Sequence, residues 1–180
     1  VFAKEYARRG NNLVLVARSE TKLHELADEL SRERKVTVKV LPQDLSNQDS
    51  AEQVLEFCKA NNLQIELLIN NAGFGLTGEF SEQSLERLEQ MISLNINSLM
   101  KLTYLFLPQM LARKSGGIIN VASTAAFQPV PYMSVYAATK AFVLSFSEGL
   151  HEELQGTGVK IMALCPGGTE TQFFEIANYS

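Results

Sequence analysis

One tyrosine and one lysine stand at a spacing that could move protons. Tyr136 and Lys140 lie four residues apart in the stretch SVYAATKAF, so a helix would place both on one face. Of the five tyrosines, only Tyr136 has a lysine four residues on. A neighbouring ammonium favours the tyrosinate and would lower the pKa of the phenol. Such a pair could pass a proton to or from a substrate oxygen, although an ordinary surface pair would show the same spacing.

Ser123 could complete this site. It ends the strand-like stretch GGIINVAS, thirteen residues before Tyr136. Its hydroxyl could hold a carbonyl or alcohol oxygen at the point where the tyrosine acts. A serine nucleophile would need a base instead, and neither His24 nor His151 falls near a strand end, which argues against a hydrolase triad. Both histidines are expected on the surface.

The elements that must position these residues alternate along the chain. Short apolar or β-branched runs predict strands at 12–17, 35–41, 65–70, 116–123 and 158–167. Apolar residues at helical spacing predict helices at 1–10, 19–34, 46–62, 84–111 and 134–154. This alternation indicates an α/β fold with a doubly wound parallel sheet and helices on both faces, a Rossmann-type three-layer sandwich. Ligands bind outside the carboxyl ends of the strands in such folds.

The composition argues against several classes of protein. A length of 180 residues fits one domain, and the net charge of −4 argues against a nucleic-acid partner. We expect no membrane span, because no window of 18 apolar residues occurs. Cys58 and Cys165 are far apart and lack the spacing of metal ligands, so we expect no metal and two buried, reduced thiols in a cytoplasmic protein.

Five motifs in order carry a family resemblance. They are NNAG (70–73), Asn95, Ser123, YAATK (136–140) and PGGTET (166–171). Together they resemble the short-chain dehydrogenase/reductase family, in its single-domain branch, and the resemblance runs from Val1 to about Thr171. It implies a nicotinamide-dependent oxidoreductase, with residues 1–180 as a single dinucleotide-binding domain.

The resemblance implies a role for each matching residue. Tyr136 would be the general acid and base, and Ser123 would polarise the substrate oxygen. Lys140 would hydrogen-bond the nicotinamide ribose and lower the pKa of Tyr136. Asn95 would hold a water in a proton relay to Lys140; without the resemblance it would be an ordinary polar helix residue. Cofactor contacts would come from Asp44 and Leu45 at the adenine, and from Asn71, Ala72, Gly73, Pro166, Gly167, Thr169 and Thr171.

The cofactor choice can be predicted from charge. NAD sites usually carry an acidic side chain at the end of the second strand of the dinucleotide-binding fold, where it accepts from the ribose 2′-hydroxyl. In this chain the strand predicted at 12–17 corresponds to that second strand, and Ala17 and Arg18 stand at its end. An arginine can pair with a 2′-phosphate. The sequence therefore predicts NADP(H), with NAD(H) or a solvated Arg18 as the alternatives.

The chain departs from the family pattern at both ends. The glycine-rich loop that holds the pyrophosphate, the first strand before it and a carboxy-terminal strand are not found in the 180 residues. We therefore expect a fold truncated at both ends, which would bind cofactor poorly, and a natural protein that has both segments.

The stretches FQPVPYM (127–133) and QFF (172–174) predict an apolar ketone or secondary alcohol as substrate. The resemblance also implies a homo-dimer or homo-tetramer, with partner surfaces on the helices expected at 85–111 and 135–154; their apolar stripes could equally face the sheet. Two other functions stay open at this point. One is a non-catalytic nucleotide-binding or scaffold protein on the same fold, and the other is a sugar-nucleotide epimerase or dehydratase.

Overall fold

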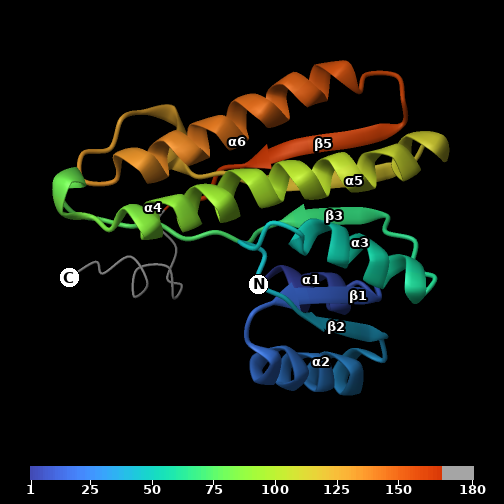
Figure 1. Ribbon diagram of the computed structural model, residues 1–180. Coiled ribbons are helices and arrows are strands. Elements are labelled where there is room, and N and C mark those ends of the chain that lie inside the picture. Colours follow the sequence, from blue (N-terminus) through green and yellow to red (C-terminus); the bar gives the residue numbers. More distant parts are fainter. Residues whose placement is uncertain (168–180) are drawn as a thin grey trace. The chain divides into compact units, whose positions relative to one another are not determined.

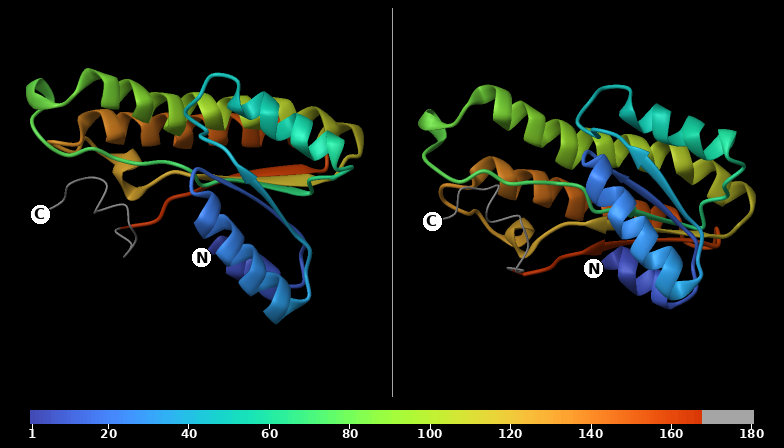
Figure 2. Two further views of the ribbon diagram at one scale, coloured as in Figure 1. Left: turned by 60° about the horizontal axis from the view of Figure 1, so that its bottom comes forward. Right: turned by 90° about the horizontal axis from the view of Figure 1, so that it is seen from below.

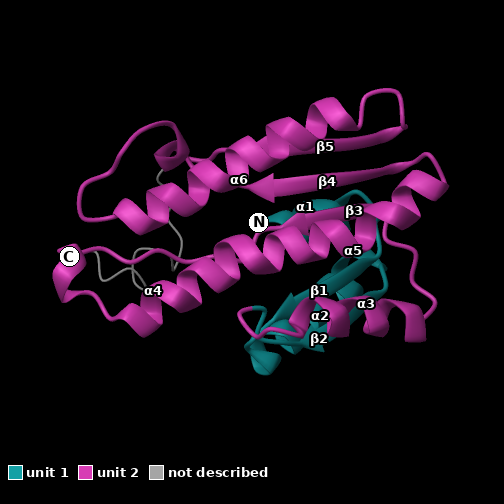
Figure 3. Ribbon diagram, turned by 45° about the horizontal axis from the view of Figure 1, so that its top comes forward, with its two compact units in different colours: residues 1–45 teal, residues 46–180 magenta. Residues whose placement is uncertain are grey.

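The computed structural model describes residues 1–167 of the chain. The chain divides into two compact units, residues 1–45 and residues 46–180 (Figure 3). Each unit contains parallel strands and helices, so the parallel α/β fold expected from the sequence is confirmed. The strands form two sheets, one of two strands and one of three. That the whole chain acts as a single domain stays a prediction.

The first unit contains two helices and two strands. These are α1 (Phe2–Arg8), β1 (Leu13–Ala17), α2 (Glu20–Arg34) and β2 (Val38–Pro42). The strands pair in parallel from Leu13 with Val38 to Ala17 with Pro42. Ala7, Leu30 and Val36 form the buried core of the unit. The register brings the carboxyl ends of β1 and β2 to the same edge.

The second unit is built around three parallel strands in the order β3-β4-β5 (Figure 1). Its strands and helices are α3 (Ser50–Ala60), β3 (Leu67–Asn70), α4 (Leu85–Ile92), α5 (Leu99–Ala112), β4 (Gly116–Val121), α6 (Ser134–Glu153) and β5 (Val159–Leu164). Short 3-10 helices span Phe80–Glu82 and Thr124–Phe127. The elements follow the predicted order, with ends that differ by a few residues.

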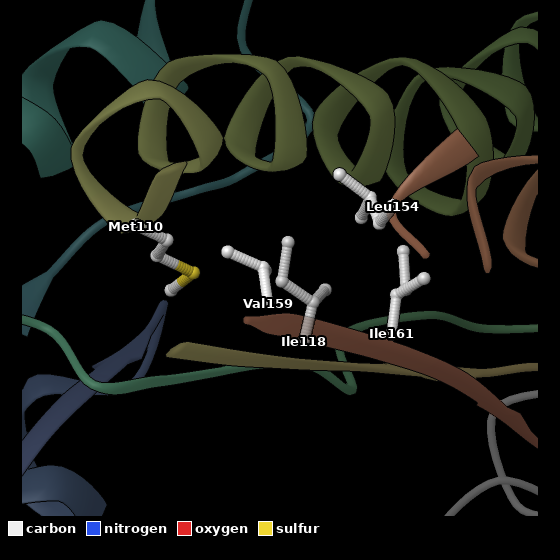
Figure 4. Packing of buried hydrophobic residues seen from close by; sticks show 5 residues of the cluster. All are labelled: Met110, Ile118, Leu154, Val159 and Ile161. Carbon is white, nitrogen blue, oxygen red and sulfur yellow. The ribbon is translucent and has the colours of Figure 1, made fainter. Parts of the chain in front are cut away.

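Helices α5 and α6 lie side by side on one face of this sheet (Figure 2). Between helices and sheet lies a core of five buried residues (Figure 4): Met110, Ile118, Leu154, Val159 and Ile161. Met110 of α5 and Leu154, which directly follows α6, lie against the three strand residues. Burying a side chain of this size contributes about 1.5–3 kcal/mol, so this core fixes both helices on the sheet.

The helix predicted at 84–111 is not regular throughout. Residues Ser93–Ser98 form a π-helical stretch between α4 and α5. A π turn inserts residues into the α-helical repeat and changes the direction in which nearby side chains point. The prediction was therefore right about the span of the helix and wrong about its regularity. Asn95, at the centre of this stretch, is buried.

The exposure of the histidines and the burial of the cysteines can be compared with the expectations from the sequence. His24 and His151 are exposed, as predicted. Cys58 is buried and Cys165 only half-buried, and both are free thiols, so the expected burial is right for the first and wrong for the second.

No helix within residues 1–167 has the length and apolar character needed to cross a membrane. Within the same residues, no three His, Cys, Asp or Glu side chains gather into a group suited to a metal ion.

Candidate active site

The predicted site residues of the second unit gather at one edge of its sheet. Strands β3, β4 and β5 are parallel, so the segments that follow them leave from the same edge. Asn71, Ala72 and Gly73 follow β3, Ser123 follows β4, and Pro166 and Gly167 follow β5. Two backbone hydrogen bonds join the last two segments: Ala122 N–H donates to the Leu164 carbonyl at 2.8 Å, and Thr124 N–H donates to the Pro166 carbonyl at 3.0 Å.

Ser123 stands at the start of the 3-10 helix that follows β4. Its Oγ accepts a hydrogen bond from the backbone N–H of Ala125 at 3.1 Å, which fixes the hydroxyl at the helix N-terminus. The same hydroxyl lies close enough to Tyr136 to lower the pKa of its phenol. The structure thus brings together the serine and tyrosine that the sequence separates by thirteen residues.

Tyr136 sits in an apolar surrounding near the start of α6. It is 7% exposed and packs with Phe74, Leu88 and Met91. Burial is the largest influence on its pKa and raises it, because the charged phenolate is disfavoured away from water. The Ser123 hydroxyl acts on the pKa in the opposite direction. The sequence predicts a pKa lowered by Lys140, and for this arrangement that prediction is wrong.

Lys140 lies one helical turn after Tyr136 and is buried. Its ammonium donates to the carbonyl of Val121 at 2.8 Å and lies 5.8 Å from the centre of the Tyr136 ring. Burial lowers the pKa of the ammonium from its ordinary value of 10.5 to about 8, and the charge of Cys165 works against this shift. Lys140 therefore carries a charge at neutral pH that is easily lost at alkaline pH.

Asn95 holds the loop after β3 in place. Its Nδ2 donates to the Phe74 carbonyl at 2.9 Å, and its Oδ1 accepts from the Phe74 N–H at 3.1 Å. The same Nδ2 donates to the Thr139 hydroxyl at 3.1 Å, on α6. One buried amide thereby joins the π-helical stretch, the NNAG loop and the helix that carries Tyr136 and Lys140.

Gly73 makes room for this arrangement. A Cβ atom at this position would lie 2.9 Å from Asn95 Oδ1 and 3.5 Å from Lys140 Nζ. The first distance is shorter than side chains tolerate, so only glycine fits here without displacing the amide. The backbone of Gly73 is exposed, and a ligand can approach it closely.

A row of buried polar side chains joins strands β3 and β4 to helices α5 and α6. Asn70 and Asn120 are paired across β3 and β4, and Asn70 Nδ2 donates to Asn120 Oδ1 at 2.9 Å. Asn70 Nδ2 also donates to Thr103 of α5 at 3.1 Å, and Asn120 Nδ2 donates to Ser147 of α6 at 3.0 Å. Asn70 Oδ1 has no hydrogen-bond partner among residues 1–167. The row ties both helices to the strands that end at the site.

Sequence reasoning assigned no role to Asn120, Thr139 or Ser147. One signal was available for the first of them: Asn120 interrupts an otherwise apolar strand, and a polar residue buried there needs a partner. Thr139 and Ser147 sit on a helix with small and polar residues on several sides. Both side chains are buried because of how α6 packs in the folded protein, and no pattern in the sequence predicts this.

The remaining predicted cofactor residues lie in the first unit or beyond the described residues. Arg18 is exposed and follows β1, while Asp44 and Leu45 follow β2. Gln43 N–H donates to the Ala17 carbonyl at 2.8 Å, so both segments leave the same edge of the two-stranded sheet. Thr169, Thr171 and the QFF stretch fall outside the described residues.

The segment expected to line the substrate pocket forms a different hollow. Residues 125–131 line it together with Ser134, Ala137, Ala138 and Ala141 of α6. Among the described residues, neither Tyr136 nor Lys140 lines this hollow. The buried apolar side chains that pack with Tyr136 come from the loop after β3 and from α4, as Phe74, Leu88 and Met91 show, and Met133 of the expected segment lies partly buried against them.

We expect Gly73→Ala to destabilise the protein. The new methyl group would push against Asn95 Oδ1, which is held by the Phe74 N–H, so the Asn95 bonds would lengthen or break. The expected loss is on the order of 1–3 kcal/mol of unfolding free energy, measured by denaturant titration of the natural full-length protein. Gly149→Ala is the matched control, because a Cβ there meets open space within α6 and should be neutral or slightly stabilising. Equal stability of both variants would contradict the steric argument.

We expect Lys140 to make stability depend on alkaline pH. Between about 8 and 10.5 the unfolded chain keeps this lysine protonated while the folded protein releases the proton. For this lysine the unfolded state then binds more protons, so its contribution to the free energy of unfolding should rise with pH in this window. The raised pKa values of the Cys58 and Cys165 thiols act in the opposite sense, so the effect of Lys140 is the difference between variants. In denaturant titrations of the cofactor-free protein, stability should gain less or lose more with pH in Lys140→Met than in wild type, whereas the exposed-site control Lys160→Met should follow wild type. The same pH dependence in all three would refute the assignment.

Comparisons with known proteins agree with this geometry. The sequence model of the short chain dehydrogenase family matches residues 1–178. A very-long-chain 3-oxoacyl-CoA reductase of Bos taurus is 35% identical over 97% of this chain, and the chain spans 57% of that relative's length.

Two solved structures are similar throughout the chain. A short-chain dehydrogenase from Sphingobium yanoikuyae in complex with NADPH has a TM-score of 0.93 and 37% identity, over 99% of this chain and 70% of its own. The bulky-bulky ketone specific alcohol dehydrogenase from Comamonas testosteroni has a TM-score of 0.88 and 36% identity, over 94% of this chain and 68% of its own. With the match of the family's sequence model over almost every residue, these likenesses establish that the chain belongs to the short chain dehydrogenase family.

Proposed function

We propose that the natural full-length protein is an oxidoreductase that transfers hydride between NADP(H) and an apolar ketone or secondary alcohol. The observation that carries this proposal is the closeness of the Ser123 hydroxyl to Tyr136, with the buried ammonium of Lys140 one helical turn away. A phenol, a hydroxyl and a cation at one point suit proton transfer to a substrate oxygen.

Tyr136 acts as the proton donor during ketone reduction. Its raised pKa keeps the phenol protonated at neutral pH, which is the form a donor needs. Ser123 donates a second hydrogen bond to the substrate oxygen and orients it toward Tyr136. As the proton leaves, the ammonium of Lys140, 5.8 Å from the ring centre, stabilises the tyrosinate that forms.

Asn95 contributes to the proposed reaction by holding the loop after β3 in place. Both polar atoms of its side chain already bond Phe74 or Thr139, so the amide fixes the loop that faces the reacting groups. The relay water assigned to Asn95 by family resemblance stays a prediction.

The residues around the site fit a nicotinamide cofactor. Gly73 presents exposed backbone with no Cβ, and Lys140 offers a cation to a ribose hydroxyl beside it. When bound, NADPH supplies the hydride for the carbonyl carbon. Asn71, Ala72, Pro166 and Gly167 follow strand ends at the same edge of the three-stranded sheet and would line the cofactor. The contact of Asp44 and Leu45 with the adenine, which the family resemblance implies, stays a prediction.

The preference for NADP(H) over NAD(H) rests on Arg18. Its guanidinium is exposed directly after β1, where NAD-binding proteins usually carry a carboxylate. A carboxylate would repel a 2′-phosphate, whereas a guanidinium can bind it through two hydrogen bonds. The similar dehydrogenase from Sphingobium yanoikuyae is itself a complex with NADPH.

The substrate class follows from the side chains around Tyr136. Phe74, Leu88 and Met91 pack with the tyrosine, and Leu76 and Met133 lie partly buried against the same cluster. An apolar ketone would therefore lose little solvation on reaching the phenol. Two similar proteins carry names that fit this chemistry, a bulky-bulky ketone specific alcohol dehydrogenase and a very-long-chain 3-oxoacyl-CoA reductase.

We expect Tyr136→Phe to abolish turnover and to leave NADPH binding nearly unchanged. The substitution removes only the hydroxyl that donates the proton, so kcat should fall by a factor on the order of 1,000 or more. NADPH consumption with aliphatic, aromatic and acyl ketones measures turnover, and calorimetric titration measures cofactor binding.

Tyr104→Phe is the matched control for this experiment. Tyr104 is 76% exposed on α5, so its loss of a hydroxyl should change neither quantity. Full activity in Tyr136→Phe would refute the proposed chemistry. A full-length protein that binds no NADPH at millimolar concentration would point to a non-catalytic scaffold instead.

We expect Arg18→Glu to reverse the cofactor preference. Losing a charge-assisted bond to the 2′-phosphate and gaining a repulsive carboxylate should weaken NADPH binding at least about tenfold. NADH binding should stay the same or improve. Calorimetric titration with both cofactors measures this, and Arg32→Glu, an exposed position on α2, controls for the change in net charge. Unchanged NADPH affinity in Arg18→Glu would show that Arg18 is an ordinary solvated residue.

A further inference from the structure

Two loops of the second unit are joined by a small group of amide bonds. The Gly78 N–H donates to the Tyr132 carbonyl at 3.0 Å. Gln83 Nε2 donates to the Gly78 carbonyl at 2.7 Å and makes a longer contact of 3.5 Å with the Tyr132 carbonyl. We call these three residues the amide clasp. Gln83 and Tyr132 are 49 residues apart in sequence, so the clasp is a tertiary contact.

Each loop held by the clasp also contributes to the surroundings of Tyr136. The loop after β3 carries Phe74 and Leu76, which pack in the cluster around the tyrosine. The other loop ends at Met133, which follows Tyr132 directly and packs against the same cluster. Helix α6 begins at the next residue, Ser134, and Tyr136 is its third residue.

The backbone at the clasp is held in conformations that need support. Tyr132 has a φ of 63°, in the left-handed region that residues with a Cβ rarely adopt. Gly78 has a φ of 135°, which glycine alone adopts readily. Strained backbone of this kind persists where surrounding contacts determine it, and it is common at functional sites. Tyr132 lies in a local turn, in which the Met133 N–H donates to the Val130 carbonyl at 3.1 Å, and the hydrogen bonds of the clasp join this turn to the loop after β3.

We propose that Gln83 is a positioning residue of the active site, which locks the loop ahead of α6 and so determines how well bulky ketones fit beside Tyr136. The inference rests on the proposed function and deepens it. The side-chain hydrogen bonds of Gln83 go to the carbonyls of Gly78 and Tyr132, so its influence is on the shape of the site. It should act on substrate binding and leave the proton transfer step unchanged.

The chemistry of the clasp requires an amide at position 83. Its NH₂ group provides two donors, and two carbonyl oxygens lie within reach, those of Gly78 and Tyr132. A glutamate of nearly the same size would present oxygens to both carbonyls and repel them. A methionine would keep the length of the side chain and supply no donor. The two substitutions thus remove the bond in different ways.

The experiment compares Gln83→Glu and Gln83→Met with the wild-type full-length enzyme. For both variants we expect KM for a bulky aromatic ketone to rise about five- to tenfold, with kcat, its pH profile and NADPH affinity unchanged. Gln109→Glu is the matched control for the change in charge. Gln109 is exposed near the C-terminal end of α5, so this variant should behave as wild type. A change in kcat or in the pH profile would overturn the inference, since it would place Gln83 in the proton transfer.

Hydrogen exchange gives a second measurement that needs no turnover. The Gly78 amide, bonded to the Tyr132 carbonyl, should exchange several-fold faster in both Gln83 variants than in wild type. Unchanged exchange would overturn the clasp, and faster exchange with unchanged KM would overturn its role in substrate fit. A wild-type enzyme that reduces no ketone would refute the proposed function, whereas the exchange data would still decide whether Gln83 holds the two loops together.

Discussion

The arrangement of the site depends on one buried side chain, that of Asn95. Its amide bonds both the N–H and the carbonyl of Phe74, as a neighbouring strand would, and reaches Thr139 on α6 with the same nitrogen. A buried amide with every bond made holds its neighbours strongly, because breaking any bond leaves a polar group without a partner. The loop after β3, the long helix and α6 are therefore fixed relative to one another at one point. Asn95 lies in the π-helical stretch, and its Oδ1 leaves no room for a Cβ at Gly73, so both features adjoin this amide.

Burial is the largest influence on the ionisation of the proposed catalytic pair, Tyr136 and Lys140, and it acts in opposite directions on its two members. It raises the pKa of Tyr136 and lowers that of Lys140, because both groups lose stability in their charged forms when removed from water. At neutral pH the phenol thus stays protonated while the ammonium stays charged. The proposed ketone reduction would require this combination of a proton donor and its electrostatic support. Under that proposal, the apolar packing of Phe74, Leu88 and Met91 would serve the chemistry as well as the core.

The sequence predicted the order of strands and helices and the grouping of Ser123, Tyr136 and Lys140, since apolar runs and strand ends are local features. Features that depend on distant partners could not be predicted. Asn95 lies in the π turn and bonds Phe74, 21 residues earlier, and the carbonyl of Tyr132 accepts from Gly78, 54 residues earlier, so neither contact can be read from local spacing. The direction of the Tyr136 pKa was predicted wrongly because spacing reveals the neighbouring lysine and hides the packing that outweighs it.

Neutral amides hold the site together at each level. Asn95 fixes the loop after β3, Asn70 and Asn120 join the strands below it, and Gln83 joins the loops at its side. Among residues 1–167, Lys140 is the one charged side chain that is buried. Charged supports at these positions would carry a large desolvation cost and would shift the pKa values of Tyr136 and Lys140. Amides provide directional bonds without a net charge, so they add no further charge beside the ammonium of Lys140.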